Sequence, residues 1–243
     1  KLGPGWCRKD GHIIGIAVGA GDSAWYFPIA HTVGNMPRKV VMKWLGDICK
    51  DTTKTVVFHN ALYDLGWLRA EGVEVKGKIR DTMVVAPLLD ENRRYYNLNS
   101  LARDHLKTYK DEKLLKSAAE EFGVDPKSGM WRLPPRYVGA YAEQDALITL
   151  RLWNELEKKI VSEECTGIFN LETKLTPILL DMKTKGVRVD LDKAQKVKKD
   201  LTKLEKTLLD EITKDTGVAM EPWVATSVAK VFDAVGLSYS RTE

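Results

Sequence analysis

The spacing of apolar residues predicts a strand-rich start followed by a mostly helical chain. Residues 12–20 and 24–29 are rich in apolar side chains, and Gly21-Asp22 between them is typical of a hairpin turn. A further β-branched, apolar run covers residues 55–59. We therefore predict two strands joined by a hairpin and another strand further along the chain.

Helical periodicity begins at Pro37, a residue that suits the first turn of a helix. The apolar residues at helical spacing in this segment, which we expect to be buried, are Val40, Val41, Trp44, Leu45 and Ile48. The next helix directly follows the strand at 55–59, because Asn60 is a typical N-cap and Gly72 a typical C-terminal stop. Asp64 then lies within about one turn of the helix start, near the strand's carboxyl end, where ligands usually bind in α/β sheets.

The remainder of the chain reads as a series of helices. In the first part they cover residues 81–90, 97–109, 111–122 and about 136–159, with a loop rich in Pro and Gly at 125–135. Asp81 and either Asn97 or Asn99 are suitable caps. Further helices cover 168–185, 191–216 and 224–235, and only residues 186–190 among them have strand character. We place a domain boundary between residues 165 and 166, which divides the chain into 1–165 and 166–243.

Composition narrows the picture only slightly. Of the 243 residues, 44% are hydrophobic and 30% charged, which is sufficient for a sizeable core. The net charge of +4 permits a polyanionic partner without indicating one. Three scattered cysteines and four scattered histidines support neither a disulfide framework nor a zinc site, and we interpret the histidines as structural. We find no signal peptide and no apolar run long enough to span a membrane.

The two ends of the sequence suggest a piece of a longer polypeptide. The chain starts with Lys1-Leu-Gly-Pro-Gly-Trp6 and lacks an initiating methionine. It stops at Ser238-Tyr-Ser-Arg-Thr-Glu243, just after a helical pattern. We therefore expect further chain on either side.

Two acidic motifs carry candidate chemistry. Asn60 and Asp64 are four residues apart on one predicted helix, and so are Tyr141 and Asp145 on another, so each pair shares a helix face. Cleaving a phosphodiester bond with two divalent ions needs several converging carboxylates, because hard ions prefer oxygen ligands. Each motif alone is weak evidence, since a solvated acid or a tyrosine at the core edge explains it equally well.

The two motifs together resemble the DEDD superfamily of 3′–5′ exonucleases, in its tyrosine-bearing variety. The second motif of that family is matched by Phe58-His-Asn-Ala-Leu-Tyr-Asp64, and the third by Tyr141-Ala-Glu-Gln-Asp-Ala-Leu-Ile-Thr149. Asp81-Thr-Met and Asn97-Leu-Asn-Ser-Leu-Ala102 resemble the segments between them. The resemblance covers about residues 12–160. It implies a ribonuclease H-like mixed sheet flanked by helices, in which 12–20 and 24–29 are the second and third strands of the opening meander.

The resemblance also implies roles for these residues. Asp145 would hold the Mg²⁺ or Mn²⁺ ion that activates water, and Tyr141 would orient that water. Asp64 would support a second ion, and Asn60 would contact the terminal nucleotide. The implied substrate is DNA, and the implied location is the bacterial nucleoid or the cytoplasm of a phage-infected host.

The family's first motif, Asp-x-Glu on the first strand, has no counterpart in this sequence. Asp10 is the only acidic residue ahead of His12, and no Glu lies two residues after it. We therefore expect that the first strand lies upstream in a longer protein and that this chain, by itself, forms an incomplete two-metal site.

A second resemblance covers the C-terminal part. Residues 171–190 are similar to the phrase that opens the polymerase part of family A, DNA polymerase I-like enzymes, and 191–216 is similar to the first long helix of their thumb. The resemblance implies that Lys196, Lys199 and Lys203 contact the backbone of a primer–template duplex. The alternative is an ordinary solvated helix face opposite the apolar stripe formed by Leu201, Leu204, Leu208 and Ile212.

The loop before the third motif is a candidate for binding a single-stranded 3′ end. Trp131 could stack on a base, and Arg132 and Arg136 could contact phosphates. The alternative is a tryptophan that fixes the loop to the core.

Three functions remain open at this point. We favour a proofreading 3′–5′ exonuclease joined to the start of a polymerase thumb, truncated before the palm and fingers. The alternatives are a free-standing RNA 3′-exonuclease of the same superfamily and a catalytically silent DNA-binding or scaffold fragment.

Overall fold

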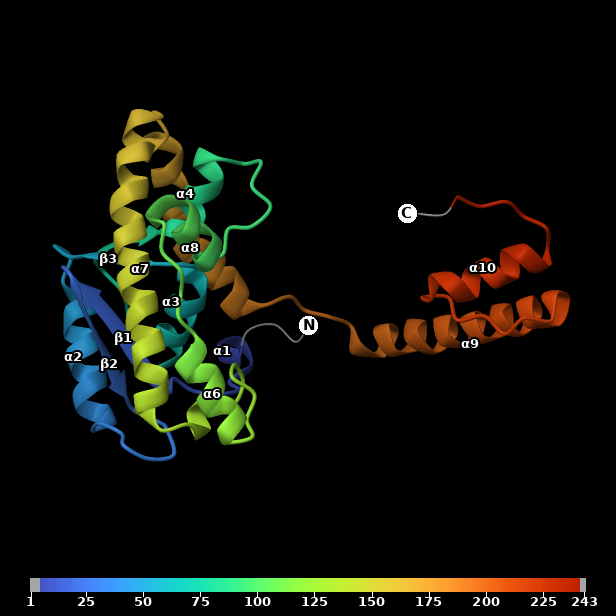
Figure 1. Cartoon of the computed structure of the whole chain (residues 1–243), viewed down its shortest axis with the longest axis horizontal. Coiled ribbons are helices and arrows are strands. Elements are labelled where there is room, and N and C mark those ends of the chain that lie inside the picture. The colour runs from blue at the N-terminus through green and yellow to red at the C-terminus, as the bar shows by residue number, and fades with distance from the viewer. Residues whose placement is uncertain (1–4, 241–243) are drawn as a thin grey trace. The chain divides into compact units, whose positions relative to one another are not determined.

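The computed structural model describes residues 5–240, and the chain has a mixed α/β structure (Figure 1). The strands are β1 (Gly15–Ala20), β2 (Ser23–Pro28), β3 (Thr55–Phe58) and β4 (Lys78–Asp81). The helices are α1 (Gly5–Arg8), α2 (Arg38–Lys50), α3 (Ala61–Ala70), α4 (Thr82–Leu89), α5 (Leu98–Leu101), α6 (Lys113–Glu121), α7 (Pro135–Ser162), α8 (Thr166–Lys185), α9 (Leu191–Thr216) and α10 (Ala225–Ala234). Residues 1–4 and 241–243, on which the expectation of a longer chain partly rests, lie outside the described part.

The predicted hairpin is confirmed. β1 and β2 pair antiparallel from Gly15 opposite Pro28 to Ala20 opposite Ser23, and Gly21 takes the left-handed conformation that this tight turn needs (φ 58°). The long helix α7 packs across both strands (Figure 1). Gly19 permits that approach, because a Cβ atom there would lie 3.1 Å from the carbonyl oxygen of Ala146. The hairpin thus supports the helix that carries Tyr141 and Asp145.

A second sheet contains a strand that the sequence pattern does not reveal. β3 pairs parallel with β4, and the register sets Phe58 opposite Asp81. Residues 78–81 are Lys-Ile-Arg-Asp, and one apolar residue among four is too few to indicate a strand. The sequence pattern predicts only a helix that starts at residue 81. The helix α4 in fact begins at Thr82, and the side chain of Asp81 caps it as predicted, by accepting a hydrogen bond from the backbone N–H of Met83.

The buried face of α2 differs from the predicted one. Val41, Leu45 and Cys49 are buried, whereas Val40 is 63% exposed. Trp44 is also exposed, with its ring 4.7 Å from that of Phe27. Leu45 and Cys49 pack with Val73, so the most buried positions of α2 are 41, 45 and 49 rather than 40, 44 and 48.

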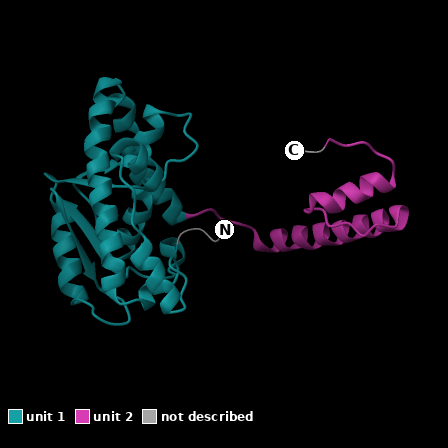
Figure 2. Cartoon of the chain, in the orientation of Figure 1, with its two compact units in different colours: residues 1–185 teal, residues 186–243 magenta. Residues whose placement is uncertain are grey.

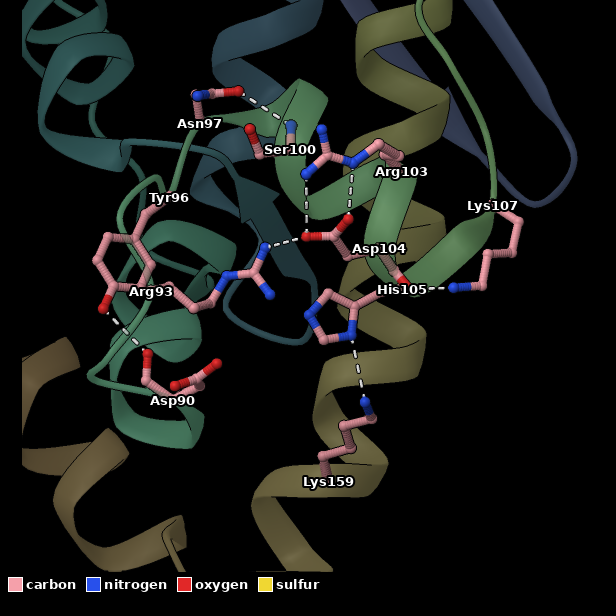
Figure 3. Close-up of polar contacts among 10 residues, drawn as sticks. All are labelled: Asp90, Arg93, Tyr96, Asn97, Ser100, Arg103, Asp104, His105, Lys107 and Lys159. Carbon is pink, nitrogen blue, oxygen red and sulfur yellow. Dashed lines mark hydrogen bonds and ion pairs between the residues drawn. The ribbon is translucent and has the colours of Figure 1, made fainter.

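The predicted helix at 97–109 ends three residues early, at Leu106, and is α-helical only in its first turn. α5 is followed by a π-helical turn over residues 102–106, and Lys107 then ends the helix in the left-handed conformation (φ 53°). Asp104 in this turn is held by the guanidinium groups of Arg93 and Arg103, and the ammonium of Lys107 donates to the carbonyl of Asp104 at 3.1 Å (Figure 3). These contacts stabilise a widened turn, which hydrophobic spacing alone could not predict. Asn97 caps α5 as expected, through the N–H of Ser100.

The main core forms where α7 meets α4 and α5. Ile148, Leu152 and Leu156 of α7 pack with Val85 and Leu101. A smaller core includes Leu133, and beside it the buried ring of His31 bonds the carbonyl of Leu133 at 2.8 Å and the hydroxyl of Tyr26 at 2.6 Å. This pairing agrees with the interpretation of His31 as structural.

The chain divides into two compact units, at a different place from the predicted one (Figure 2). The division falls between Lys185 and Gly186 rather than at residue 165, because α8 packs on α3 and α4 and buries Leu180 beside Leu65. The assignment of the later segment to a polymerase thumb stays a prediction.

The second unit consists of α9 and α10, and residues 186–190 form irregular backbone rather than a strand. Leu201, Leu204 and Leu208 of the apolar stripe are between 48% and 60% exposed. In the described residues, no helix combines the length and the apolarity that crossing a bilayer requires.

Candidate active site

Tyr141 and Asp145 lie one helical turn apart on α7, and both side chains are half-buried. The helix is fixed against the hairpin by Glu143, whose carboxylate accepts a hydrogen bond from the backbone N–H of Tyr26 at 2.9 Å. The predicted pairing of these two residues on one face is therefore confirmed as geometry.

Lys110 completes this cluster, although no sequence motif points to it. Its Nζ atom lies 2.6 Å from Oδ1 of Asp145 and 2.7 Å from Oδ2. The same atom donates to the hydroxyl of Tyr141 at 3.3 Å and lies 4.6 Å from the centre of the Tyr141 ring. Lys110 follows a polar loop, and no sequence pattern distinguishes it from Lys107 or Lys113.

The loop that carries Lys110 is fixed to α7 at two more points. The amide oxygen of Gln144 accepts from the backbone N–H of Asp111 at 2.8 Å, and the amide nitrogen donates to the carbonyl of Tyr109 at 3.4 Å. Only 8% of the Lys110 side chain is exposed. The ammonium group is thus held at Asp145 by a fixed strap.

Burial and charge shape the titration of this cluster. Burial raises the pKa of Asp145, and Lys110 acts in the opposite direction. Burial alone would lower the pKa of Lys110, but its hydrogen bond and charge interaction with Asp145 outweigh that effect, and the pKa is raised. Burial and the Asp145 charge raise the pKa of Tyr141. Lys110 is therefore a permanent cation at neutral pH.

Asn60 occupies the N-cap position of α3, but the expectation that its side chain caps the helix is wrong. The backbone of Asn60 is left-handed (φ 72°), and its side chain is exposed. Asp81 provides the acceptors instead: Oδ1 accepts from the N–H of Asn60 at 2.9 Å, and Oδ2 from the N–H of Ala61 at 2.7 Å. The pairing of β3 with β4 brings Asp81 to this position, and the amide of Asn60 stays available to a ligand.

Asp64 lies in the first turn of α3, as predicted, and is half-buried. Burial raises its pKa to about 7, and the nearby charge of Asp81 contributes in the same direction. A nearby positive charge would stabilise the ionised form of this carboxyl group and lower its pKa.

The donors present suit a hard cation, since Asp64 and Asp145 offer carboxylate oxygens and a divalent ion would favour the ionised form of both. Within residues 5–240, however, no three Asp, Glu, His or Cys side chains are grouped so that they could hold a metal ion. The binding of a metal ion by Asp64 and Asp145 therefore stays a prediction.

The remaining candidates are exposed. Trp131, Arg132 and Arg136 are all exposed, and the guanidinium of Arg132 lies 5.0 Å from the centre of the Trp131 ring. Leu133 rather than Trp131 is the residue of this loop that is fully buried. Lys196, Lys199 and Lys203 are exposed on α9 in the second unit.

Comparison with known proteins gives a consistent picture. Residues 6–161 match the family model of the 3′–5′ exonuclease of DNA polymerase A. A DNA-directed DNA polymerase of Pseudomonas phage M6 is 33% identical over all of this chain and 38% of the relative's length. DNA polymerase I of Pseudomonas aeruginosa is 27% identical over 75% of this chain and 20% of its own length. The chain therefore spans less than two fifths of these relatives.

Two solved structures share the fold. The POL domain of Pol1 from M. smegmatis, in complex with DNA primer-template and dNTP, aligns with 96% of this chain and 36% of that chain (TM-score 0.66, 16% identity). A structure described as the apo form of the nuclease aligns with 74% of this chain and 79% of that chain (TM-score 0.57, 17% identity).

These likenesses agree with the predicted ribonuclease H-like fold. Because the family model covers most of the first unit, the chain belongs to the 3′–5′ exonuclease family of DNA polymerase A, a family of enzymes found in phage and bacterial polymerases.

Proposed function

We propose that this chain is the proofreading 3′–5′ exonuclease part of a family A DNA polymerase, followed by the start of the thumb. The observation that carries the proposal is the pairing of Tyr141 with Asp145 on one face of α7, inside the segment that matches the exonuclease family. The reaction is hydrolysis of the terminal phosphodiester bond of DNA.

Divalent ions, when bound, would supply a Lewis acid and a more acidic water for this hydrolysis. Asp145 and Asp64 are the residues that would hold them. The Tyr141 hydroxyl, at the end of a half-buried ring, orients the attacking water by hydrogen bonding. The Asp-x-Glu carboxylates of the family's first motif are not in this sequence, so the chain alone is expected to be impaired.

The substrate end is bound by groups outside the metal site. The exposed amide of Asn60 contacts the terminal nucleotide, and the left-handed backbone, held by Asp81, fixes its direction. Trp131 stacks on a base of the single strand, while Arg132 and Arg136 contact its phosphates. The exposure of all three side chains supports this part of the proposal.

The second unit contacts duplex DNA in the proposal. Lys196, Lys199 and Lys203 recur at helical spacing on α9 and are exposed, as phosphate-binding side chains must be. The POL domain of M. smegmatis Pol1 is in complex with a DNA primer-template, which supports the same class of partner here.

The test measures shortening of a 5′-labelled single-stranded DNA with Mg²⁺ present. It compares this chain with a longer polypeptide that adds the upstream strand. In the longer polypeptide, Asp145→Ala should reduce the rate at least about a hundredfold, because it removes a metal ligand. Asp22→Ala is the matched control, since 98% of the Asp22 side chain is exposed.

The same assay separates the alternatives. Faster digestion of an RNA of identical sequence would favour the RNA exonuclease. If the longer polypeptide binds DNA but digests neither substrate, the fragment is a binding or scaffold module and the proposal is wrong.

A further inference from the structure

The Asp145 carboxylate already has a cation that belongs to the chain. Nζ of Lys110 donates a hydrogen bond to Oδ2 at 2.7 Å and lies 2.6 Å from Oδ1, which is buried and accepts no hydrogen bond, so one ammonium group is the cation next to both oxygens. This is the carboxylate that the proposed function assigns to a divalent ion. The two cations would need the same acceptor.

The position of Lys110 is built into the fold. Lys110 is 35 residues before Asp145 in sequence, and the strap of residues 109–111 is hydrogen-bonded to Gln144 on both sides of it. The ammonium also lies over the ring of Tyr141, and only 8% of the Lys110 side chain is exposed. A mobile surface lysine would have none of these restraints.

Charge repulsion prevents simultaneous binding in this geometry. Mg²⁺ approaches carboxylate oxygens to about 2.0–2.1 Å. Mn²⁺ prefers the same oxygen ligands. An ammonium group that spans both oxygens of the same carboxylate would then be within a few ångströms of a doubly charged ion. The ammonium would have to leave Asp145, and its hydrogen bond to the Tyr141 hydroxyl would be lost with it.

We infer that Lys110 is a built-in counterion of Asp145 that competes with the divalent ion and so sets how tightly this ion is held. The inference rests on the proposed function, because it needs a metal ion at Asp145. Lys110 acts through Asp145 and is a positioning residue rather than a catalytic one.

The test measures Mn²⁺ binding without nucleic acid, from the free Mn²⁺ signal in electron paramagnetic resonance, on the longer polypeptide that carries the first-motif carboxylates. Lys110→Met removes the charge and keeps an apolar side chain over Tyr141. Lys110→Gln also removes the charge but leaves a polar side chain there. Lys110→Arg keeps the charge, Lys113→Met is the matched control on the same segment, and Asp145→Asn removes the ligand. Circular dichroism checks that each variant is folded.

Both neutral variants should bind Mn²⁺ at least about tenfold more tightly than the unchanged chain, since a charge this close alters a carboxylate's cation affinity by one power of ten or more. Lys110→Arg and Lys113→Met should bind like the unchanged chain. If Asp145→Asn abolishes binding but the neutral variants bind no more tightly, the inference fails and the proposed metal role stands. If no binding depends on Asp145 in any variant, the proposed metal role fails and the inference fails with it.

Discussion

The carboxylate of Asp81 accepts a hydrogen bond from the backbone N–H of Asn60 at 2.9 Å, which joins the end of β4 to the start of α3. The same carboxylate accepts from the N–H groups of Ala61 and Met83, and it is only 6% exposed. One buried side chain therefore caps two helices and fixes the backbone of a candidate substrate-binding residue.

Asp81→Ala should lower the free energy of unfolding by about 2–4 kcal/mol, because three backbone donors lose their acceptor in a buried place. Urea denaturation followed by circular dichroism measures this. Asp22→Ala, at a position that is 98% exposed, should change the stability by less than about 0.5 kcal/mol. Equal stability of the two variants would contradict the double-capping role.

Asp64 should make the stability of the metal-free chain fall as pH rises. Its pKa is about 7 in the folded chain, against an ordinary value of 3.8, so the folded chain binds this proton more tightly than the unfolded chain. The contribution is fully present below about pH 4, decreases towards pH 7 and is lost above it.

Asp64→Asn tests this dependence, because the amide does not titrate. In EDTA, the stability of the variant relative to the unchanged chain should increase from about pH 5 to about pH 8, measured by urea denaturation at each pH. A difference that stays constant over this interval would show that Asp64 titrates normally.

Trp131→Ala should weaken binding of single-stranded DNA by roughly 5- to 150-fold, the range for loss of one base–aromatic stack of about 1–3 kcal/mol. Fluorescence anisotropy of a labelled oligonucleotide measures the affinity. The melting temperature should change little, since the side chain is 40% exposed.

Leu133→Ala is the contrasting variant in the same loop. Leu133 is fully buried, so its truncation should destabilise the chain by about 2–5 kcal/mol. If Trp131→Ala destabilises as strongly and leaves the affinity of the folded chain unchanged, Trp131 fixes the loop and does not bind DNA.

The lysines of α9 should determine part of the salt dependence of duplex binding. Changing Lys196, Lys199 and Lys203 to Gln should make the plot of log K against log salt shallower by up to about 0.9 per lysine. Lys198→Gln is the control, because two residues of helix rotate it by about 200° from Lys196. An unchanged slope in the triple variant would support the plain solvated face.

Local features of the chain were predictable from sequence because they depend on neighbours within a few residues. The Gly21-Asp22 turn, the cap at Asn97 and the one-turn spacing of Tyr141 and Asp145 are of this kind. The family resemblance was readable for the same reason, since its motifs are short phrases on single helices.

Tertiary structure alone decided the features that depend on distant residues. β4 forms from residues with almost no strand pattern because β3 offers it a parallel partner, and this pairing delivers Asp81 to the start of α3 in place of the Asn60 side chain. Lys110 reaches Asp145 only through the strap across α7, and α8 joins the first unit only because α3 and α4 cover it. Hydrophobic periodicity indicates which face of a helix or strand is apolar. It does not determine which distant residues that face, or the polar residues at the ends of the element, will contact.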